Sequence, residues 1–197
     1  MDFMKIMTSD EGYIGDNLKI PDELKLKGKE LCWKYNQTSP ASKDERIRIL
    51  KELFGTCSDK TFIQPVFNCD YGFNIHTHGF ALINYNCTIL DTSPVHLGDG
   101  TFIGPGVVIA CAGHSMDAAQ RKEAICTSFP ITIENDVWIG ANCTICGGVT
   151  IGAGSVIGAG SVVNKDIPAG VVAVGNPCRV LRKITDADKI NKENIMF

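Results

Sequence analysis

A polar stretch at residues 112–129 carries the residue whose chemistry is most suggestive in this sequence, His114. An imidazole has a pKa near ~6.5, so it can take up and return a proton at neutral pH. Polar loops on rigid scaffolds are also where functional sites concentrate. By residue type alone, a single loop histidine is more often an ordinary exposed side chain. The stretch is therefore a candidate catalytic loop, with His114 as a candidate general base.

Two other groups allow different chemistry. Cys111 stands close to His114, and a thiol beside an imidazole can act as a nucleophile. A cysteine that only packs is the favoured interpretation of Cys111. His76 and His78 alternate along an expected strand, so their rings point the same way. With His114 they would supply three imidazoles, which is enough for a metal site.

A repeat of six residues runs through residues 131–168, directly after the polar stretch. A small or β-branched residue precedes each repeated aliphatic residue by two places, and the aliphatic residues are Ile133, Ile139, Ile145, Ile151, Ile157 and Val163. This period fits neither an α-helix nor a meander of hairpins. It predicts a solenoid of short parallel strands that turn a corner every six residues, a hexapeptide β-helix.

The repeat divides the chain into three parts. It extends back to residue 61 with short slips and disappears only at residues 112–129, so residues 61–168 form the expected β-helix with one extruded loop. Residues 1–60 have helical spacing and predict two or three short helices that cap the solenoid. Residues 169–197 are expected to be a tail that covers the last coil, whose edge would otherwise invite association.

Composition narrows the class of protein. The chain has 19 basic and 22 acidic residues, a net charge of −3, which gives no case for nucleic-acid binding. No apolar run approaches the ~18 residues of a membrane span, and the charged start is unlike a signal peptide, so we expect a cytoplasmic protein. Nine cysteines, several at inward positions of the repeat such as Cys87 and Cys143, indicate reduced core residues. Cys143 and Cys146 lack a second pair that would complete a zinc site.

An ordered set of motifs is similar to the maltose, galactoside and nodulation-factor O-acetyltransferases. The resemblance covers most of the chain, and its motifs are Cys69-Asp70-Tyr71-Gly72, Asn84-Tyr85-Asn86-Cys87, Ala112-Gly113-His114, Val137-Trp138-Ile139-Gly140, Lys165-Asp166-Ile167-Pro168 and Gly175-Asn176-Pro177-Cys178-Arg179. Galactoside-specific members carry serine in place of Asp70, so the chain resembles the maltose branch more closely.

The resemblance implies a fold, a donor and an assembly. The implied fold is a left-handed parallel β-helix with a helical N-terminal segment. Its handedness rests on the resemblance alone, because crossover statistics favour the opposite hand. The implied assembly is a homotrimer with sites between neighbouring subunits. The implied donor is acetyl-CoA, no metal is required, and the implied acceptor is a sugar such as maltose or glucose.

The resemblance also implies catalytic roles. His114 matches the catalytic base of the family, although Ser115 follows it where proline is common. Asn84 matches an asparagine that contacts the acceptor and the oxyanion of the intermediate, and it could instead be a turn residue. The partner that orients His114 is left open. Asp117 and Glu123 are nearby candidates, and residues 124–127 contain no acid where the family often has a glutamate.

Two binding sets complete the implied site. Carboxylates accept hydrogen bonds from sugar hydroxyls, and Asp16, Asp70 and Asp91 resemble acceptor-binding positions. The positions that resemble coenzyme A contacts are Trp138, Ala141, Ala159, Asn164, Lys165, Arg179 and Arg182. Without the resemblance, the three cations would be ordinary surface charges.

Two alternative functions stay open. The acceptor could be another hydroxylated compound, because pocket shape at a subunit junction cannot be read from the sequence. The histidines would also suit a metal hydratase similar to the γ-type carbonic anhydrases, which are trimeric hexapeptide proteins as well. The N-terminal helices, Asn84 and the cationic C-terminal segment fit the transferase better.

Overall fold

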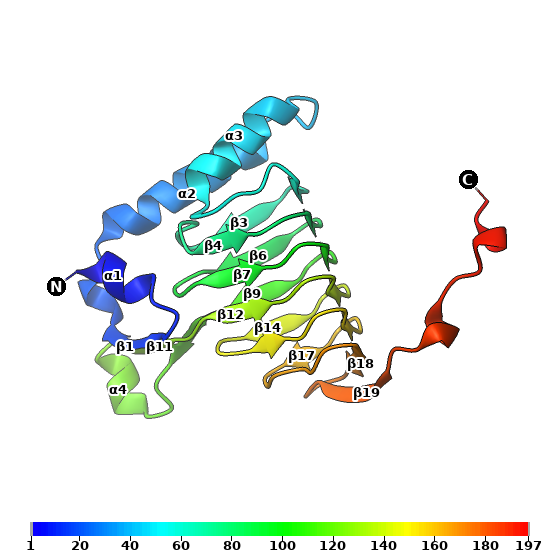
Figure 1. The fold of residues 1–197 in the computed structure, drawn as a ribbon. Coiled ribbons are helices and arrows are strands. Elements are labelled where there is room, and N and C mark those ends of the chain that lie inside the picture. Colours follow the sequence, from blue (N-terminus) through cyan, green and yellow to red (C-terminus); the bar gives the residue numbers. More distant parts are fainter. Residues whose placement is uncertain (1, 197) are drawn as a thin grey trace.

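The computed structural model describes residues 2–196, which form N-terminal helices stacked on a β-solenoid (Figure 1). The helices are α1 (Phe3–Met7), α2 (Asp22–Gln37) and α3 (Lys43–Leu53), and they lie in residues 1–60, where the sequence predicts two or three short helices. A short strand, β1 (Tyr13–Asp16), and a 3-10 turn (Asn17–Lys19) lie between α1 and α2. The sequence did not predict β1, and this strand becomes part of the candidate site.

The solenoid has three parallel faces, which we number in chain order. Face 1 contains β2 (Thr61–Ile63), β5 (Ala81–Ile83), β8 (Thr101–Ile103), β13 (Trp138–Ile139), β16 (Val156–Ile157) and β18 (Val171–Val174), with β19 (Arg179–Lys183) added antiparallel at its end. Face 2 contains β3 (Phe67–Cys69), β6 (Cys87–Leu90), β9 (Val108–Ala110), β14 (Thr144–Cys146) and β17 (Val162–Val163). Face 3 contains β4 (Ile75–Thr77), β7 (Val95–Leu97), β12 (Ile131–Ile133) and β15 (Thr150–Ile151). The parallel β-helix that the repeat predicts is confirmed.

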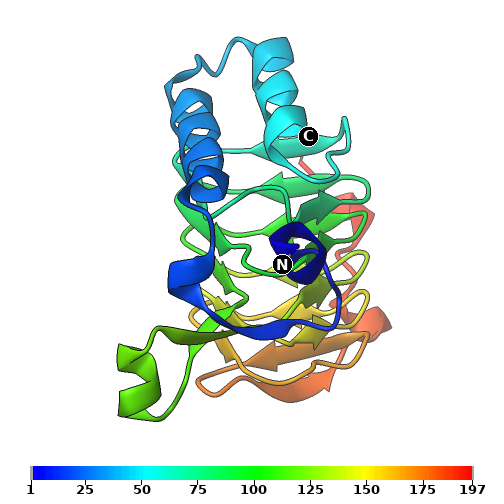
Figure 2. The ribbon, with the colours of Figure 1, turned by 90° about the vertical axis from the view of Figure 1, so that its left-hand side faces the viewer.

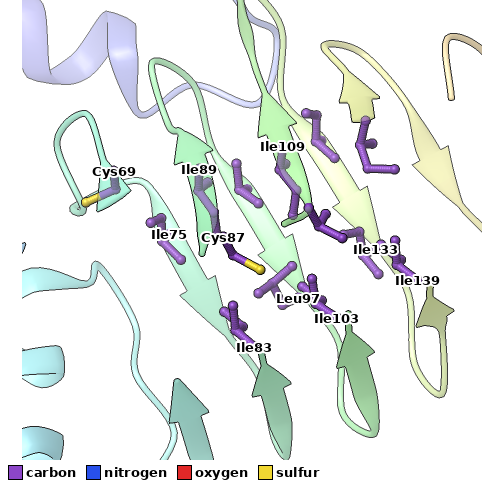
Figure 3. Close-up of a cluster of buried hydrophobic side chains, with 14 of the residues drawn as sticks. Cys69, Ile75, Ile83, Cys87, Ile89, Leu97, Ile103, Ile109, Ile133 and Ile139 are labelled. Carbon is purple, nitrogen blue, oxygen red and sulfur yellow. The ribbon is translucent and has the colours of Figure 1, made fainter. Parts of the chain in front are cut away.

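The repeated aliphatic residues form one stacked core. Ile139, Ile145, Ile151, Ile157 and Val163 are each 0% exposed, and the ladder continues through the earlier coils (Figure 3). Fully burying such a side chain stabilises the fold by about 1.5–3 kcal/mol. Cys87 and Cys143 fill small inward positions as predicted, and the cysteines of the described residues are all free thiols.

The corners are as constrained as the core. At the corner between faces 1 and 2, a Cβ on Gly104 would lie 2.7 Å from the nitrogen of Ala141. One coil further, a Cβ on Gly140 would lie 2.6 Å from the nitrogen of Ala159. Glycine is needed there because one corner backbone rests directly on the next.

Helices α2 and α3 close the first coil at one end of the solenoid (Figure 1). The buried Arg46 of α3 donates hydrogen bonds of 3.0 Å to the carbonyl oxygens of Thr38 and Ile63. Its guanidinium also lies 4.0 Å from the centroid of the Tyr35 ring. A cation satisfied in this way ties the helices to the first coil.

The other end of the solenoid differs from expectation. Strands β18 and β19 finish face 1, but from Thr185 onward the chain leaves the solenoid instead of lying over its last coil (Figure 1). This segment carries two 3-10 turns, Asp186–Asp188 and Lys192–Asn194, and buries none of their residues. The apolar side chains of this segment, Ile190, Ile195 and Met196, are accordingly exposed.

Candidate active site

The polar stretch forms an ordered arm rather than an irregular loop. It leaves the corner between faces 2 and 3 after β9 and consists of β10 (Ala112–His114), α4 (Ala118–Lys122) and β11 (Ile125–Ser128). Strand β11 pairs antiparallel with β10 on one side and with β1 on the other. In Figure 2 the blue N-terminal segment accordingly runs beside the green arm. The N-terminal segment therefore helps to position the candidate base.

Local contacts fix the tip and the root of the arm. Asp117 caps α4 by accepting a hydrogen bond from the Gln120 nitrogen at 2.9 Å. At the root, the Thr92 and Ser128 hydroxyl oxygens lie 2.6 Å apart and join the arm to the solenoid corner. Gly113 pairs with Thr127, and a Cβ on Gly113 would lie 2.7 Å from the Thr127 hydroxyl oxygen. A glycine before His114 therefore leaves room for the opposing side chain.

His114 ends β10, directly opposite Cys126, and its side chain is exposed. The structure brings neither suggested orienting acid to the imidazole, because Asp117 is used as the α4 cap and Glu123 ends that helix. Among residues 2–196, no side chain or carbonyl forms a hydrogen bond with the His114 ring. The imidazole is therefore held only through its own backbone and is open to solvent.

His114 lines a pocket of about 320 Å³ between the arm, β1, α2 and the solenoid corner. Its lining is mixed, with hydroxyl, carboxyl, ammonium and apolar groups, from Tyr13, Asn17, Lys25, Lys29, Asp70, Tyr71, Leu90, Thr92, Ala112, Gly113, His114, Cys126 and Thr127. A small concave site with a few convergent polar groups suits a small polar ligand.

Asp70 is the carboxylate of this pocket. It follows β3 at the corner between faces 2 and 3 and is half-buried. Burial raises the pKa of Asp70, and the nearby Lys25 and Lys29 ammonium groups oppose that rise. A carboxylate that is partly desolvated but flanked by cations is well suited to accept hydrogen bonds from ligand hydroxyls.

The structure gives Asp91 a different position from the predicted one. Asp91 is 0% exposed, and its carboxylate accepts hydrogen bonds from the backbone nitrogens of Asp70 at 3.1 Å and Tyr71 at 2.9 Å. The prediction that Asp91 contacts the acceptor therefore does not fit, because its side chain points into the corner. Thr92, one residue later, lines the pocket instead and was missed.

Asp16 lies beside the pocket rather than in its lining. It ends β1 opposite Ile125, and its carboxylate accepts a hydrogen bond from the Leu18 nitrogen at 3.0 Å. It also forms an ion pair with Lys19 at 3.5 Å. Asn17, the next residue, does line the pocket.

Asn84 lies at a different corner of the solenoid. It follows β5, and its nitrogen donates a hydrogen bond to the Ile103 carbonyl at 2.9 Å. It therefore belongs to the corner between faces 1 and 2, whereas His114 leaves from the corner between faces 2 and 3. The single chain does not bring Asn84 into the pocket with His114.

The expected coenzyme A residues also divide between these two corners. Ala141 and Ala159 lie at the corner of Asn84, and Trp138 stands beside them on face 1 with 56% of its surface exposed. Asn164 and Lys165 follow β17 at the other corner. The Arg179 guanidinium lies 3.4 Å from the Asn164 side-chain oxygen.

Arg182 is engaged elsewhere. Its guanidinium forms two hydrogen bonds to the Asp188 carboxylate, at 2.6 and 2.8 Å. The pairing lowers the pKa of Asp188 to about 2. Arg182 would have to release Asp188 before binding a phosphate.

The groups behind the alternative functions lie elsewhere in the fold. Cys111 is 1% exposed, and burial raises its pKa to about 12, which leaves it a thiol and a poor nucleophile. His76 and His78 gather with His96 on face 3, not with His114, and the His78 Nε2 and His96 Nδ1 atoms are 3.2 Å apart. Within residues 2–196, no group of three His, Cys, Asp or Glu side chains has an arrangement that could hold a metal ion. In the same part of the chain, no helix is both long enough and apolar enough to span a bilayer.

Comparisons with known proteins match both halves of this architecture. A family model described as bacterial transferase hexapeptide (six repeats) matches residues 130–165. A second, the maltose acetyltransferase hexapeptide capping motif, matches residues 7–58 and so includes β1, α2 and α3.

Individual proteins are similar over nearly the whole chain. The galactoside O-acetyltransferase of Escherichia coli K12 is 45% identical over 167 residues, 85% of this chain and 82% of its own. The crystal structure of a maltose O-acetyltransferase from Clostridium difficile 630 has a TM-score of 0.86 at 40% identity, covering 94% of this chain and 99% of its own. A hexapeptide-repeat acetyltransferase from Vibrio cholerae, solved with acetyl coenzyme A, has a TM-score of 0.86 at 38% identity and covers 94% of this chain and 100% of its own.

Proposed function

The chain belongs to the hexapeptide-repeat O-acetyltransferases of the maltose and galactoside group, and from this we propose that it transfers the acetyl group of acetyl-CoA to a hydroxyl of a small sugar such as maltose or glucose. One observation carries the acceptor side of the proposal. The exposed imidazole of His114 and the flanked carboxylate of Asp70 line the same pocket. A base and a hydroxyl-binding group share one small site.

His114 is the proposed general base in a direct transfer within a ternary complex. Its imidazole takes the proton of the attacking hydroxyl while the oxygen bonds to the thioester carbon. The same imidazolium returns that proton to the coenzyme A sulfur as the carbon–sulfur bond breaks. The products are the acetyl ester and free coenzyme A thiol, and no acyl-enzyme forms. The buried, protonated Cys111 supports a route without a cysteine nucleophile.

Asn84 is the proposed donor to the oxyanion that develops at the thioester carbonyl. A preorganised amide donor at that point is typically worth ~10²–10³ in turnover. Asn84 lies at the corner between faces 1 and 2, with the small corner residues Ala141 and Ala159 two and three coils away. Small residues there would allow the extended pantetheine arm of the donor to approach the backbone.

The separation of the two corners supports a homotrimer with sites between subunits. His114 and the acceptor pocket lie at the corner between faces 2 and 3, whereas Asn84 lies at the corner between faces 1 and 2. A cyclic assembly repeats one interface. It can therefore set the corner between faces 2 and 3 of each chain against the corner between faces 1 and 2 of its neighbour. The proposed active site is complete only at that junction.

The donor phosphates are assigned to cations near the last coils. Lys165 is exposed at the corner after β17, and the Arg179 guanidinium is held close to Asn164. Arginine suits phosphate because its planar fork donates two parallel hydrogen bonds. Trp138, exposed on face 1 beside the other corner, would line the mouth of the shared site. The pairing of Arg182 with Asp188 makes Arg182 the weakest member of this set.

The test is an acceptor screen with the purified protein, acetyl-CoA and a panel of sugars and other hydroxylated compounds, in which free thiol release is followed. We expect turnover with at least one sugar. His114→Ala should lower turnover by ~10²–10⁴, the usual range for loss of a general base, while coenzyme A affinity stays unchanged. Cys111→Ser is the matched control and should retain activity. Near-normal turnover in His114→Ala would refute the assigned base.

A further inference from the structure

One tyrosine that lines the acceptor pocket has a buried hydroxyl without a hydrogen-bond partner among the described residues. Tyr71 lines the pocket, is only 3% exposed, and its hydroxyl oxygen finds no donor or acceptor among residues 2–196. Buried polar atoms in proteins are nearly always paired, because leaving one unpaired costs free energy. Because the residue that carries this hydroxyl lines a pocket, a ligand bound there could supply the missing partner.

Three contacts hold Tyr71 in its position. The Tyr71 nitrogen donates a hydrogen bond to the buried Asp91 carboxylate at 2.9 Å. The ring packs against Phe73, with 5.3 Å between the ring centroids. Helix α2 also packs tightly against the Tyr71 backbone. A Cβ on Gly28 of this helix would lie 2.7 Å from the Tyr71 carbonyl oxygen. Three contacts therefore fix the tyrosine where its hydroxyl is unpaired.

The surroundings determine what this hydroxyl can do. Burial is the main cause that raises the pKa values of Tyr71 and of Tyr13, the latter to about 12. Both phenols thus keep their protons at neutral pH and can donate. The adjacent Asp70, when ionised, can only accept. The pocket presents a donor and an acceptor on consecutive residues.

We propose that Tyr71 is a specificity residue whose hydroxyl donates a hydrogen bond to one oxygen of the bound acceptor, next to a hydroxyl that donates to Asp70. This pairing selects a ligand with two neighbouring oxygens, as on the vicinal hydroxyls of a sugar, over an isolated alcohol. The inference rests on the proposed acetyl transfer and adds to it the class of acceptor: a vicinal polyol.

Tyr71→Phe removes only the hydroxyl and tests this directly. In the free protein the variant loses no hydrogen bond, so its melting temperature should stay the same or rise. Its KM for the sugar found in the acceptor screen should increase about 3- to 10-fold, the effect of one neutral hydrogen bond. Because the contact exists in both the ground and transition states, kcat should change little.

Tyr35→Phe is the matched control. Tyr35 is also buried, at 1% exposed, but its hydroxyl already donates to the Ile63 carbonyl at 2.7 Å and lies away from the pocket. This variant should lower the melting temperature and leave the sugar KM unchanged. A Tyr71→Phe protein with unchanged KM, or one destabilised as Tyr35→Phe is, would overturn the inference.

Deoxy analogues of the sugar separate this inference from the proposed function. Removal of the oxygen that Tyr71 contacts should raise the KM of the wild-type protein and leave that of Tyr71→Phe nearly unaffected. If the KM of the wild type and that of the variant rise by the same factor on every analogue, Tyr71 does not contact the acceptor. The proposed acetyl transfer is unaffected by that result. If the wild-type protein releases no thiol with any acceptor, the proposed function itself fails.

Discussion

His114 and Asp70 reach one pocket from distant parts of the chain, and a third residue holds the corner between them. Asp91 accepts hydrogen bonds from the backbone nitrogens of Asp70, Tyr71 and Asn74. A carboxylate that orders three backbone amides beside the pocket would act on a bound acceptor only through Asp70 and Tyr71. Asp91 is thus a positioning residue.

The burial of Asp91 makes stability depend on pH. Desolvation raises its pKa from 3.8 to about 6, so in this range the folded state binds the proton more tightly than the unfolded state. The stabilising contribution is full below pH ~4 and is lost as the pH rises through ~6, with an upper limit of about 3 kcal/mol. The free energy of unfolding of the wild type and of Asp91→Asn can be measured by denaturation between pH 4 and 7. It should fall with rising pH in the wild type, and the fall should be smaller in the variant.

Asp186→Asn is the control for this titration, because the Asp186 side chain is 91% exposed. Its stability profile should follow that of the wild type. An Asp91→Asn profile parallel to the wild type throughout would mean that Asp91 has an ordinary carboxyl pKa.

At the scale of elements, helix α2 forms one wall of the pocket, and Gly28 sets how close it comes. A Cβ at this position would lie 2.7 Å from the Tyr71 carbonyl oxygen and 2.9 Å from that of Asp70. The approach lets Lys25 and Lys29 reach the pocket edge and moderate the pKa of Asp70.

Gly28→Ala is therefore expected to lower the stability of the protein, although helix propensity alone would raise it. Alanine inside a helix normally stabilises by about 1 kcal/mol relative to glycine. Here the added carbon meets backbone on a second element, and overpacking of this kind costs about 1–3 kcal/mol. We expect a lower melting temperature and a higher acceptor KM. The control is Lys27→Ala on the exposed side of the same helix, which should change stability by less than about 0.5 kcal/mol. A Gly28→Ala protein that is more stable than wild type would contradict the tight approach.

The sequence predicted some elements well and others not at all, for physical reasons. The stacked aliphatic residues such as Ile139 and Ile157 can be recognised in the sequence from their six-residue period, because each coil repeats the same environment. Strand β1 has no period of its own. It exists because β11 offers it an edge, and only tertiary structure creates that edge.

The same distinction holds for the candidate site. His114 was predicted as the base from its polar context and from the motif around it, and the structure shows that it lines a pocket. The sequence analysis chose Asp91 and missed Thr92. These two residues are adjacent at one corner, but the Thr92 side chain faces the pocket and the Asp91 side chain faces inward, and the sequence pattern does not distinguish the two directions. The partner-free hydroxyl of Tyr71 carries no sequence signal at all, since nothing in the pattern tells a paired phenol from an unpaired one.

At the scale of the whole molecule, the residues of the proposed site are divided between two corners of the solenoid. His114 and the acceptor pocket extend from the corner between faces 2 and 3, and Asn84 lies at the corner between faces 1 and 2. We propose that catalysis takes place where the corner between faces 2 and 3 of one chain meets the corner between faces 1 and 2 of its neighbour.

The direct measurement is turnover in mixed assemblies of two inactive variants, His114→Ala and Asn84→Ala, produced together so that their chains combine. Each variant alone should be nearly inactive. In a cyclic assembly about one junction in four would join an intact His114 to an intact Asn84, so the mixture should regain about a quarter of wild-type turnover. A mixture no more active than the separate variants would contradict a site shared between subunits.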